Sequence, residues 1–220
     1  MTKRLDGMKV AVLAADGFEQ VELTRPAKAL EGEGALVDVI SLKPGKIRGM
    51  NLHLPGLKVK VDRVISEVAP DDYDALLIPG GFMNPDMLRQ SPDVLDFVRA
   101  IAAAGKPIAS ICHGPWVLIS AGLVEGRRFT SWPGIRDDVT NAGGVWEDSA
   151  VVRDGLFVTS RSPMDLPRFN EAVIGLFAEH IPPGRAEEAR ERRGVPVGRY
   201  VVGGLALAAA AALIARRAAA

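Results

Sequence analysis

The residues most able to do chemistry are neighbours in the stretch ASICHGPW, where Cys112 is followed directly by His113. Cys112 is the only cysteine among the 220 residues, and His113 is one of three histidines. A thiolate is a strong nucleophile, and an imidazole beside it can take up the thiol proton. A lone cysteine in an apolar strand is also common as an inert core residue. The residue types alone leave both interpretations open.

The flanking sequence places Cys112 at a strand-to-helix turn. KPIASIC predicts a short buried strand, and HGPWVLISAGL predicts a short helix that ends at Gly122. Gly114 lets the backbone bend, and Pro115 suits the first turn of a helix. This is the arrangement of a nucleophile elbow, which exposes one side chain above a sheet. Because helix N-terminal N–H groups favour a thiolate, we expect the pKa of Cys112 to be lowered.

Two other strand ends carry polar groups toward the same edge. AADGFEQVEL follows the first predicted strand and contains Glu19. PGGFMNPDML follows another strand and begins with Gly80 and Gly81, with Asp86 further on. The backbone N–H of His113, together with one from the Gly80–Gly81 loop, is a candidate oxyanion hole. Glu19 and Asp86 each have a simpler alternative role as a charge in the first turn of a helix.

Strands of apolar residues alternate with helical segments, which predicts a mostly parallel sheet covered by helices on both faces. Sites in such sheets form beyond the carboxyl ends of the strands. We expect a first helix from about Glu19 that is interrupted at Pro26, and a helix after Ser91 as N-cap. Hairpins are expected in KPGKIRGMNLHLPGLKV and in SAVVRDGLFVTS, the latter turning at Asp154-Gly155.

The composition limits the classes of partner and site. The 27 basic and 27 acidic residues give a formal net charge of +0, so no nucleic-acid binding is expected. A single cysteine cannot form an internal disulfide, and the N-terminal sequence has no cleavage pattern, which favours a cytoplasmic protein. His53, His113 and His180 are scattered and no second thiol is present, so neither a metal nor another cofactor is expected.

The character of the chain changes near its C-terminus. We expect an α/β domain over residues 1–181, a charged linker rich in Pro, Gly and Arg over 182–199, and an Ala-rich hydrophobic helix over 200–217. The uncharged part of that helix would span roughly 24 Å, less than the roughly 30 Å of a hydrocarbon core. A membrane anchor and a helix lying on a protein or membrane surface both stay open.

Several separated motifs, in the same order and at similar spacing, resemble the ThiJ/PfpI superfamily, and most closely its PfpI-type cysteine hydrolases and stress proteins. The resemblance covers residues of about 8–180 and is carried by DGFEQVEL, DALLIPGG, NPDMLR, GKPIASICHGPWVL, AGLVEGRRFTSWPGIRDDVTNAGG and VVRDGLFVTSRSPMDLPRFN. It implies a flavodoxin-like three-layer α/β sandwich with a class I glutamine amidotransferase-like fold. It also implies dimers or larger homo-oligomers.

The resemblance further implies roles for particular residues. Cys112 would be the nucleophile, Glu19 the acid that hydrogen-bonds its sulfur, and His113 the adjacent base. In the PfpI branch a carboxylate from a neighbouring subunit completes a Cys-His-acid triad, and the matching position here is Asp86. This residue is an aspartate where the branch has a longer glutamate, and its loop is one residue longer.

These roles predict a cysteine-dependent stress-response hydrolase that acts on carbonyl or glycation adducts, of the glyoxalase or deglycase type. A PfpI-type intracellular cysteine peptidase, a glutamine amidotransferase-like protein and a non-enzymatic redox sensor that oxidises at Cys112 are the alternatives. The substrate would be a small carbonyl compound, a peptide or a glycated protein.

Overall fold

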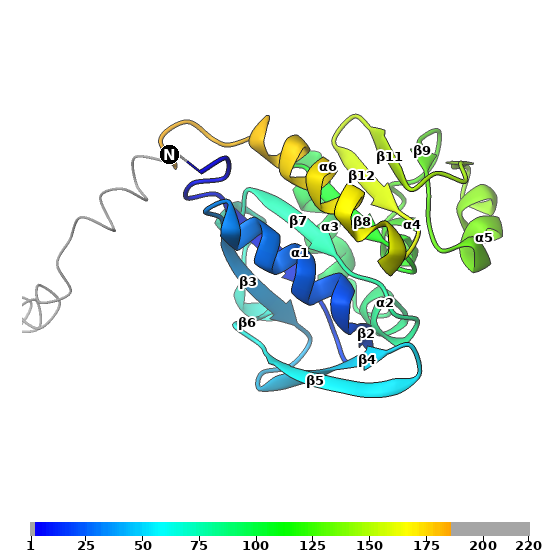
Figure 1. Ribbon diagram of the computed structural model, residues 1–220, viewed down its shortest axis with the longest axis horizontal. Helices are drawn as coiled ribbons and strands as arrows, with labels where there is room; N and C mark the ends of the chain where they lie inside the picture. The colour runs from blue at the N-terminus through cyan, green and yellow to red at the C-terminus, as the bar shows by residue number, and fades with distance from the viewer. Residues whose placement is uncertain (1–2, 186–220) are drawn as a thin grey trace, which may run out of the picture.

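The structure is a computed structural model that describes residues 3–185 (Figure 1). The described residues include 3–181 of the domain predicted over 1–181, and the boundaries of that domain stay a prediction. Most of the predicted linker over 182–199, and the whole predicted helix over 200–217, lie outside the described residues.

A central sheet of seven strands forms the middle layer. The strands, in chain order, are β1 (Lys9–Leu13), β3 (Leu36–Ser41), β6 (Arg63–Val64), β7 (Ala75–Ile78), β8 (Ile108–Ile111), β11 (Val151–Asp154) and β12 (Phe157–Ser160). Their order across the sheet is β11-β12-β8-β7-β1-β3-β6. All neighbours are parallel except β11 and β12, so the carboxyl ends of β1, β7 and β8 meet at one edge.

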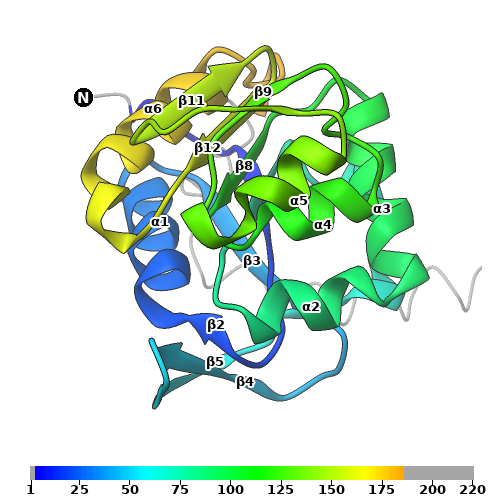
Figure 2. The ribbon, with the colours of Figure 1, turned by 90° about the vertical axis from the view of Figure 1, so that its right-hand side faces the viewer.

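Helices cover both faces of this sheet, with α1 and α6 on one side and α3 and α4 on the other (Figures 1 and 2). The α-helices are α1 (Gln20–Gly32), α2 (Met83–Arg89), α3 (Pro92–Ala103), α4 (Pro115–Ser120), α5 (Arg136–Asn141) and α6 (Leu166–Ala178). Short 3₁₀ helices are η1 (Ile65–Glu67), η2 (Pro70–Asp72), η3 (Pro133–Ile135) and η4 (Pro163–Asp165).

Strand β1 shows how the apolar sequence builds two cores. Val10 and Val12 belong to the core on the side of α1 and α6, whereas Ala11 and Leu13 belong to the core on the side of α3 and α4. Successive side chains of a strand point to opposite faces, so a strand buried on both faces must be apolar throughout. The short runs in β7 and β8 are buried throughout for the same reason.

Two small sheets flank the central one. β2 (Phe18–Glu19) pairs with β4 (Lys46–Asn51), which forms an antiparallel hairpin with β5 (Leu54–Lys60). Figure 2 shows this β4–β5 hairpin beside β2, apart from the central sheet. The second small sheet joins β9 (Arg128–Phe129) and β10 (Val145–Trp146).

The predicted fold class, a mostly parallel α/β sandwich with a flavodoxin-like arrangement, is confirmed. Both predicted hairpins are present, and Ser91 caps α3 by accepting a hydrogen bond from the Val94 N–H at 3.5 Å. The predicted interruption at Pro26 is wrong, because α1 continues through it. Pro26 removes one hydrogen bond to the Glu22 carbonyl, and the burial of Leu23 and Leu30 holds the helix together on either side.

Among residues 3–185, no helix is both long enough and apolar enough to cross a membrane.

Candidate active site

The predicted nucleophile elbow is present at Cys112. The chain leaves β8 at Ile111, Cys112 adopts a left-handed backbone conformation with φ of 62°, and α4 begins at Pro115. Such a conformation costs a non-glycine residue about 1 to 3 kcal/mol and persists only where the surroundings impose it. Here the Cys112 N–H donates to the Ser160 carbonyl at 3.0 Å, and the Cys112 carbonyl accepts from the Trp132 N–H at 2.9 Å.

Gly114 is required by this turn, because a side chain there would collide with its neighbours. An added Cβ would approach the Ile78 carbonyl oxygen to 2.7 Å and would also meet the hydroxyl of Ser110. The glycine therefore lets the turn lie directly over the carboxyl ends of β7 and β8.

His113 contacts the thiol directly, with 3.2 Å between Cys112 Sγ and His113 Nδ1. Its ring lies between two tryptophans, edge-on to Trp116 at 5.2 Å and stacked with Trp132 at 5.9 Å between ring centroids. This burial lowers the pKa of His113 below its ordinary value of 6.5, and the negative charge of Asp138 partly opposes the shift. The imidazole is therefore neutral at pH 7 and can accept the thiol proton.

The carboxyl group that interacts with the sulfur is that of Glu22, in the first turn of α1. Glu22 is fully buried, and its Oε2 accepts a hydrogen bond from the Gly80 N–H at 2.9 Å. Burial raises the pKa of Glu22 from about 4.5 to about 8, against the opposing hydrogen bonds from Gly80 and Cys112. At pH 7 Glu22 is thus mainly a neutral carboxylic acid that can donate a proton.

The prediction that Glu19 contacts the sulfur is wrong, and Glu22 has that place. Glu19 is nearly buried at the N-cap of α1, and its Oε2 accepts from the Leu52 N–H at 2.9 Å. Glu19 and Glu22 are three residues apart and therefore share one face of the helix start. The residue one turn inside the helix reaches the floor of the site, whereas Glu19 holds the turn of the β4–β5 hairpin. Burial raises the pKa of Glu19, and the Leu52 hydrogen bond opposes this.

The expected lowering of the Cys112 pKa is also wrong. Burial raises the pKa of the thiol well above its ordinary value, and the negative charge of an ionised Glu22 adds to this. Hydrogen bonds from the backbone N–H groups of Gly81 and His113 act in the opposite direction. The resting site therefore holds a neutral thiol, and the thiolate must form when the proton is transferred.

The glycine loop after β7 has two different roles. The Gly80 N–H is occupied by Glu22, so it is not available for the predicted oxyanion hole. The N–H groups of Gly81 and His113 interact with the sulfur, which brings these two predicted donors to the reacting atom. Gly81 has φ of 82°, and a side chain there would meet the carbonyl oxygen of Gly17.

Asp86 lies away from this group within one chain. It is exposed on α2, where its Oδ2 accepts a hydrogen bond from Gln90 Nε2 at 3.2 Å. The carboxylate whose charge acts on His113 in the described part of the chain is Asp138 of α5, which the sequence analysis did not single out. The contribution of Asp86 from a neighbouring subunit stays a prediction.

A cavity of about 250 Å³ opens above the thiol. Its lining is mainly apolar and comes from six separate segments, and it consists of Glu19, Glu22, Leu52, His53, Gly81, Phe82, Cys112, His113, Trp132 and Pro163. The hairpin residues Leu52 and His53 lie in no motif that would reveal them in the sequence, whereas Trp132 and Pro163 lie in two of the segments that carry the family resemblance. Within residues 3–185, no group of three His, Cys, Asp or Glu side chains is placed to hold a metal ion.

The sequence pattern of the DJ-1/PfpI family matches residues 8–176 of the chain. The chain belongs to the DJ-1/PfpI family. The recognition made from the motifs is thereby confirmed, and the match covers every residue of the thiol site described above.

The matches between this DJ-1/PfpI protein and its relatives cover most of the length of each relative. It is 48% identical to a deglycase of Pyrococcus abyssi over 159 residues, which is 72% of this chain and 93% of the relative. It is 41% identical to general stress protein 18 of Bacillus subtilis over 172 residues, 77% of this chain and 98% of that protein. The crystal structure of DJ-1beta from Drosophila melanogaster matches with a TM-score of 0.72 at 26% identity, covering 86% of this chain and 98% of DJ-1beta.

Proposed function

We propose that the protein is a cysteine-dependent hydrolase of the deglycase type, which acts on adducts of small carbonyl compounds with amines. The names of the close relatives bear out this class of function, which the sequence predicted. The observation that carries the proposal is the grouping of a thiol with a neutral imidazole at 3.2 Å and with a carboxyl group whose pKa is about 8. Such a set can form a nucleophile and also move a second proton.

The first step breaks the bond between carbon and nitrogen in the adduct. His113 Nδ1 takes the thiol proton, and Cys112 Sγ attacks the carbon that carries the amine. The amine leaves with a proton from Glu22, and a hemithioacetal remains on the sulfur. The N–H groups of Gly81 and His113 stabilise the thiolate before it attacks.

The second step converts the hemithioacetal into a thioester. The Glu22 carboxylate takes the proton from the carbon bound to sulfur and returns it to the neighbouring carbonyl carbon, while the hydroxyl proton on the first carbon passes to the oxygen of that carbonyl. Water then hydrolyses the thioester to a 2-hydroxy acid; His113 returns its proton to Cys112, and the proton lost by water restores Glu22. The free amine and the hydroxy acid account for every atom of the adduct and of one water molecule.

The test compares wild type with Cys112→Ser and Glu22→Gln on methylglyoxal and on a methylglyoxal-treated amino acid. Lactate and free amine are measured by chromatography. Wild type is expected to release both, while the serine variant releases neither above the uncatalysed rate. Equal lactate release by wild type and the serine variant would exclude the thiol mechanism.

A PfpI-type peptidase is the second candidate. It would need a carboxylate that orients His113, and we propose Asp86 of a neighbouring copy in a homo-oligomer. Phe82 and Met87, which are 53% and 37% exposed on the segment that carries Asp86, support an interface there. Asp86→Asn should lower turnover of a fluorogenic peptide, with Asp93→Asn as the surface control. A peptidase rate equal to that of wild type would remove Asp86 from the site.

We further propose that the enzyme is cytoplasmic and that residues 200–217 attach it to a membrane surface. The support is the apolar sequence between Arg199 and Arg216. A truncation for this test must keep Arg185, because its guanidinium pairs with the buried carboxylate of Asp74 at 2.8 Å. In a vesicle flotation assay the full chain should float with the vesicles, whereas a chain that ends after Arg185 should not. If the full chain also fails to float, the proposal is wrong.

A further inference from the structure

The β4–β5 hairpin places positive charges directly opposite one another. In the register of the two strands, Lys46 faces Lys60 and Arg48 faces Lys58. All four residues are exposed, whereas Ile47, between the two cations of β4, is buried. Like charges at directly opposite positions destabilise a strand pair. The repulsion between these cations lowers the stability of the hairpin, and a bound anion would offset it.

The protein itself supplies little of that compensation. Lys60 pairs with Asp62 at 3.3 Å, and the Arg48 guanidinium donates to the Gly56 carbonyl at 3.1 Å. Lys46 and Lys58 have no ion pair with any carboxylate within residues 3–185. Two ammonium groups and one guanidinium on this face therefore lack a neutralising partner in the described structure.

The three cations share a hollow of about 370 Å³, which is separate from the thiol cavity. Lys46, Arg48 and Lys58 line it together with Asp16, Met50 and Met83. Asp16 is its single carboxylate, and Asp16 Oδ1 already accepts the backbone N–H of Arg48 at 2.7 Å. The hollow has an excess of two positive charges, and its volume suits a single phosphate-sized group and a few carbon atoms.

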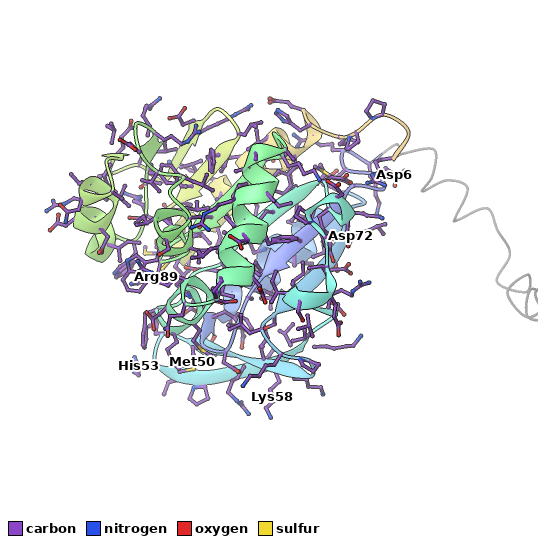
Figure 3. The ribbon with its side chains drawn as sticks, turned by 180° about the vertical axis from the view of Figure 1, so that it is seen from behind. Asp6, Met50, His53, Lys58, Asp72 and Arg89 are labelled. Atoms are coloured by element: carbon purple, nitrogen blue, oxygen red, sulfur yellow. The ribbon has the colours of Figure 1, made fainter. Side chains whose placement is uncertain are left out.

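The hollow lies next to the thiol cavity, because the same chain segments line both. Met50 lines the hollow and Leu52 lines the cavity, two residues further along the hairpin. Met83, at the start of α2, lines the hollow, and the residue before it, Phe82, lines the cavity. Figure 3 labels His53 at the turn of the hairpin, Met50 on β4 and Lys58 on β5.

We propose that the hollow formed by Lys46, Arg48 and Lys58 is a phosphate subsite, which directs phosphorylated small carbonyl compounds and their amine adducts to Cys112. The proposal rests on the proposed function and names its substrate class. The carbonyl carbon lies at the thiol while the phosphate lies against the hairpin. A guanidinium and two ammonium groups are the donors that bind phosphate oxygens in proteins.

The kinetic test compares hydroxypyruvaldehyde phosphate with hydroxypyruvaldehyde, two 2-oxoaldehydes that carry the second carbonyl group which the proposed mechanism requires. Two partly solvated charge contacts are expected to lower KM about tenfold for the phosphorylated compound. The double variant Lys46→Gln/Lys58→Gln should reduce this ratio to roughly two. Lys28→Gln on α1, an exposed lysine with no ion pair in the described part of the chain, is the matched control and should keep the ratio. Added salt should weaken the preference of wild type.

A binding test makes the result independent of turnover. Glycerol 3-phosphate has no carbonyl group, so calorimetry with this compound and with glycerol reports the subsite alone. Wild type and Lys28→Gln should bind glycerol 3-phosphate, and the double variant should bind it at least fivefold more weakly. Absence of binding to wild type, or equal binding by the double variant, overturns the subsite. Binding without turnover of either 2-oxoaldehyde would instead overturn the proposed function.

Discussion

Replacing Glu22 by glutamine should make the protein less sensitive to rising pH. Glutamine matches the shape of the protonated acid and can still accept the Gly80 N–H, but it cannot ionise. Because the pKa of Glu22 is about 8 in the fold and about 4.5 otherwise, the folded chain holds one more proton than the unfolded chain between these values. The free energy of unfolding therefore falls as pH rises through this window.

The size of the effect follows from the same two values. Between pH 5 and pH 7 the ionisation of Glu22 should cost wild type about 2 to 3 kcal/mol, with a further loss up to pH 8. The Glu22→Gln variant should show none of this loss. The free energy of unfolding of the variant, taken relative to that of wild type, should therefore rise by about 2 to 3 kcal/mol between pH 5 and pH 7.

Urea unfolding at pH 5, 6, 7 and 8 measures the difference. Glu31→Gln, an exposed glutamate on the same helix, is the control and should follow wild type at every pH. Parallel pH profiles for wild type and Glu22→Gln would refute the conclusion that Glu22 is held neutral in the site.

Three further predictions concern the thiol, the glycine loop and the C-terminal ion pair. Alkylation of Cys112 by iodoacetamide should be slow at pH 7, and its rate should rise steeply above pH 9. The Glu22→Gln variant should react several-fold faster at pH 9, because the negative charge beside the thiol is absent. A rate that reaches a plateau below pH 7 would contradict the raised pKa of Cys112. Gly81→Ala should lower stability by more than about 2 kcal/mol and abolish turnover, as measured by thermal unfolding and lactate release, because its Cβ meets the Gly17 carbonyl at a positive φ. Arg185→Met should cost about 2 to 3 kcal/mol in urea unfolding, since Asp74 is only 5% exposed, whereas Arg25→Met on the exposed side of α1 should cost less than about 0.5 kcal/mol.

The sequence was sufficient for the features that depend on local patterns. Alternating apolar strands and helices predicted the layered sheet, and the small residues around Cys112 predicted the elbow. These features follow from periodicity and from turn chemistry, which act over a few residues. The contact between Cys112 and His113 could not be predicted in the same way, because it depends on the left-handed backbone of Cys112.

The choice between Glu19 and Glu22 lies beyond local patterns. Both residues share one face of the helix start, and only the path of the loop after β7 decides which carboxylate meets the sulfur. The signal that could have found Glu22 is its position one turn inside an amphipathic helix, on the apolar face with Leu23. The raised pKa of Cys112 likewise depends on burial by segments far apart in the chain.

The left-handed backbone of Cys112 sets stability against reactivity at one position. Glycine adopts that conformation without strain, so Cys112→Gly would relieve the turn while removing the only sulfhydryl of the chain. The relief of strain opposes the loss of packing that follows when a buried side chain is removed. Backbone strain at this position therefore favours replacement of cysteine by glycine, and only selection for the function of the thiol would keep cysteine in place.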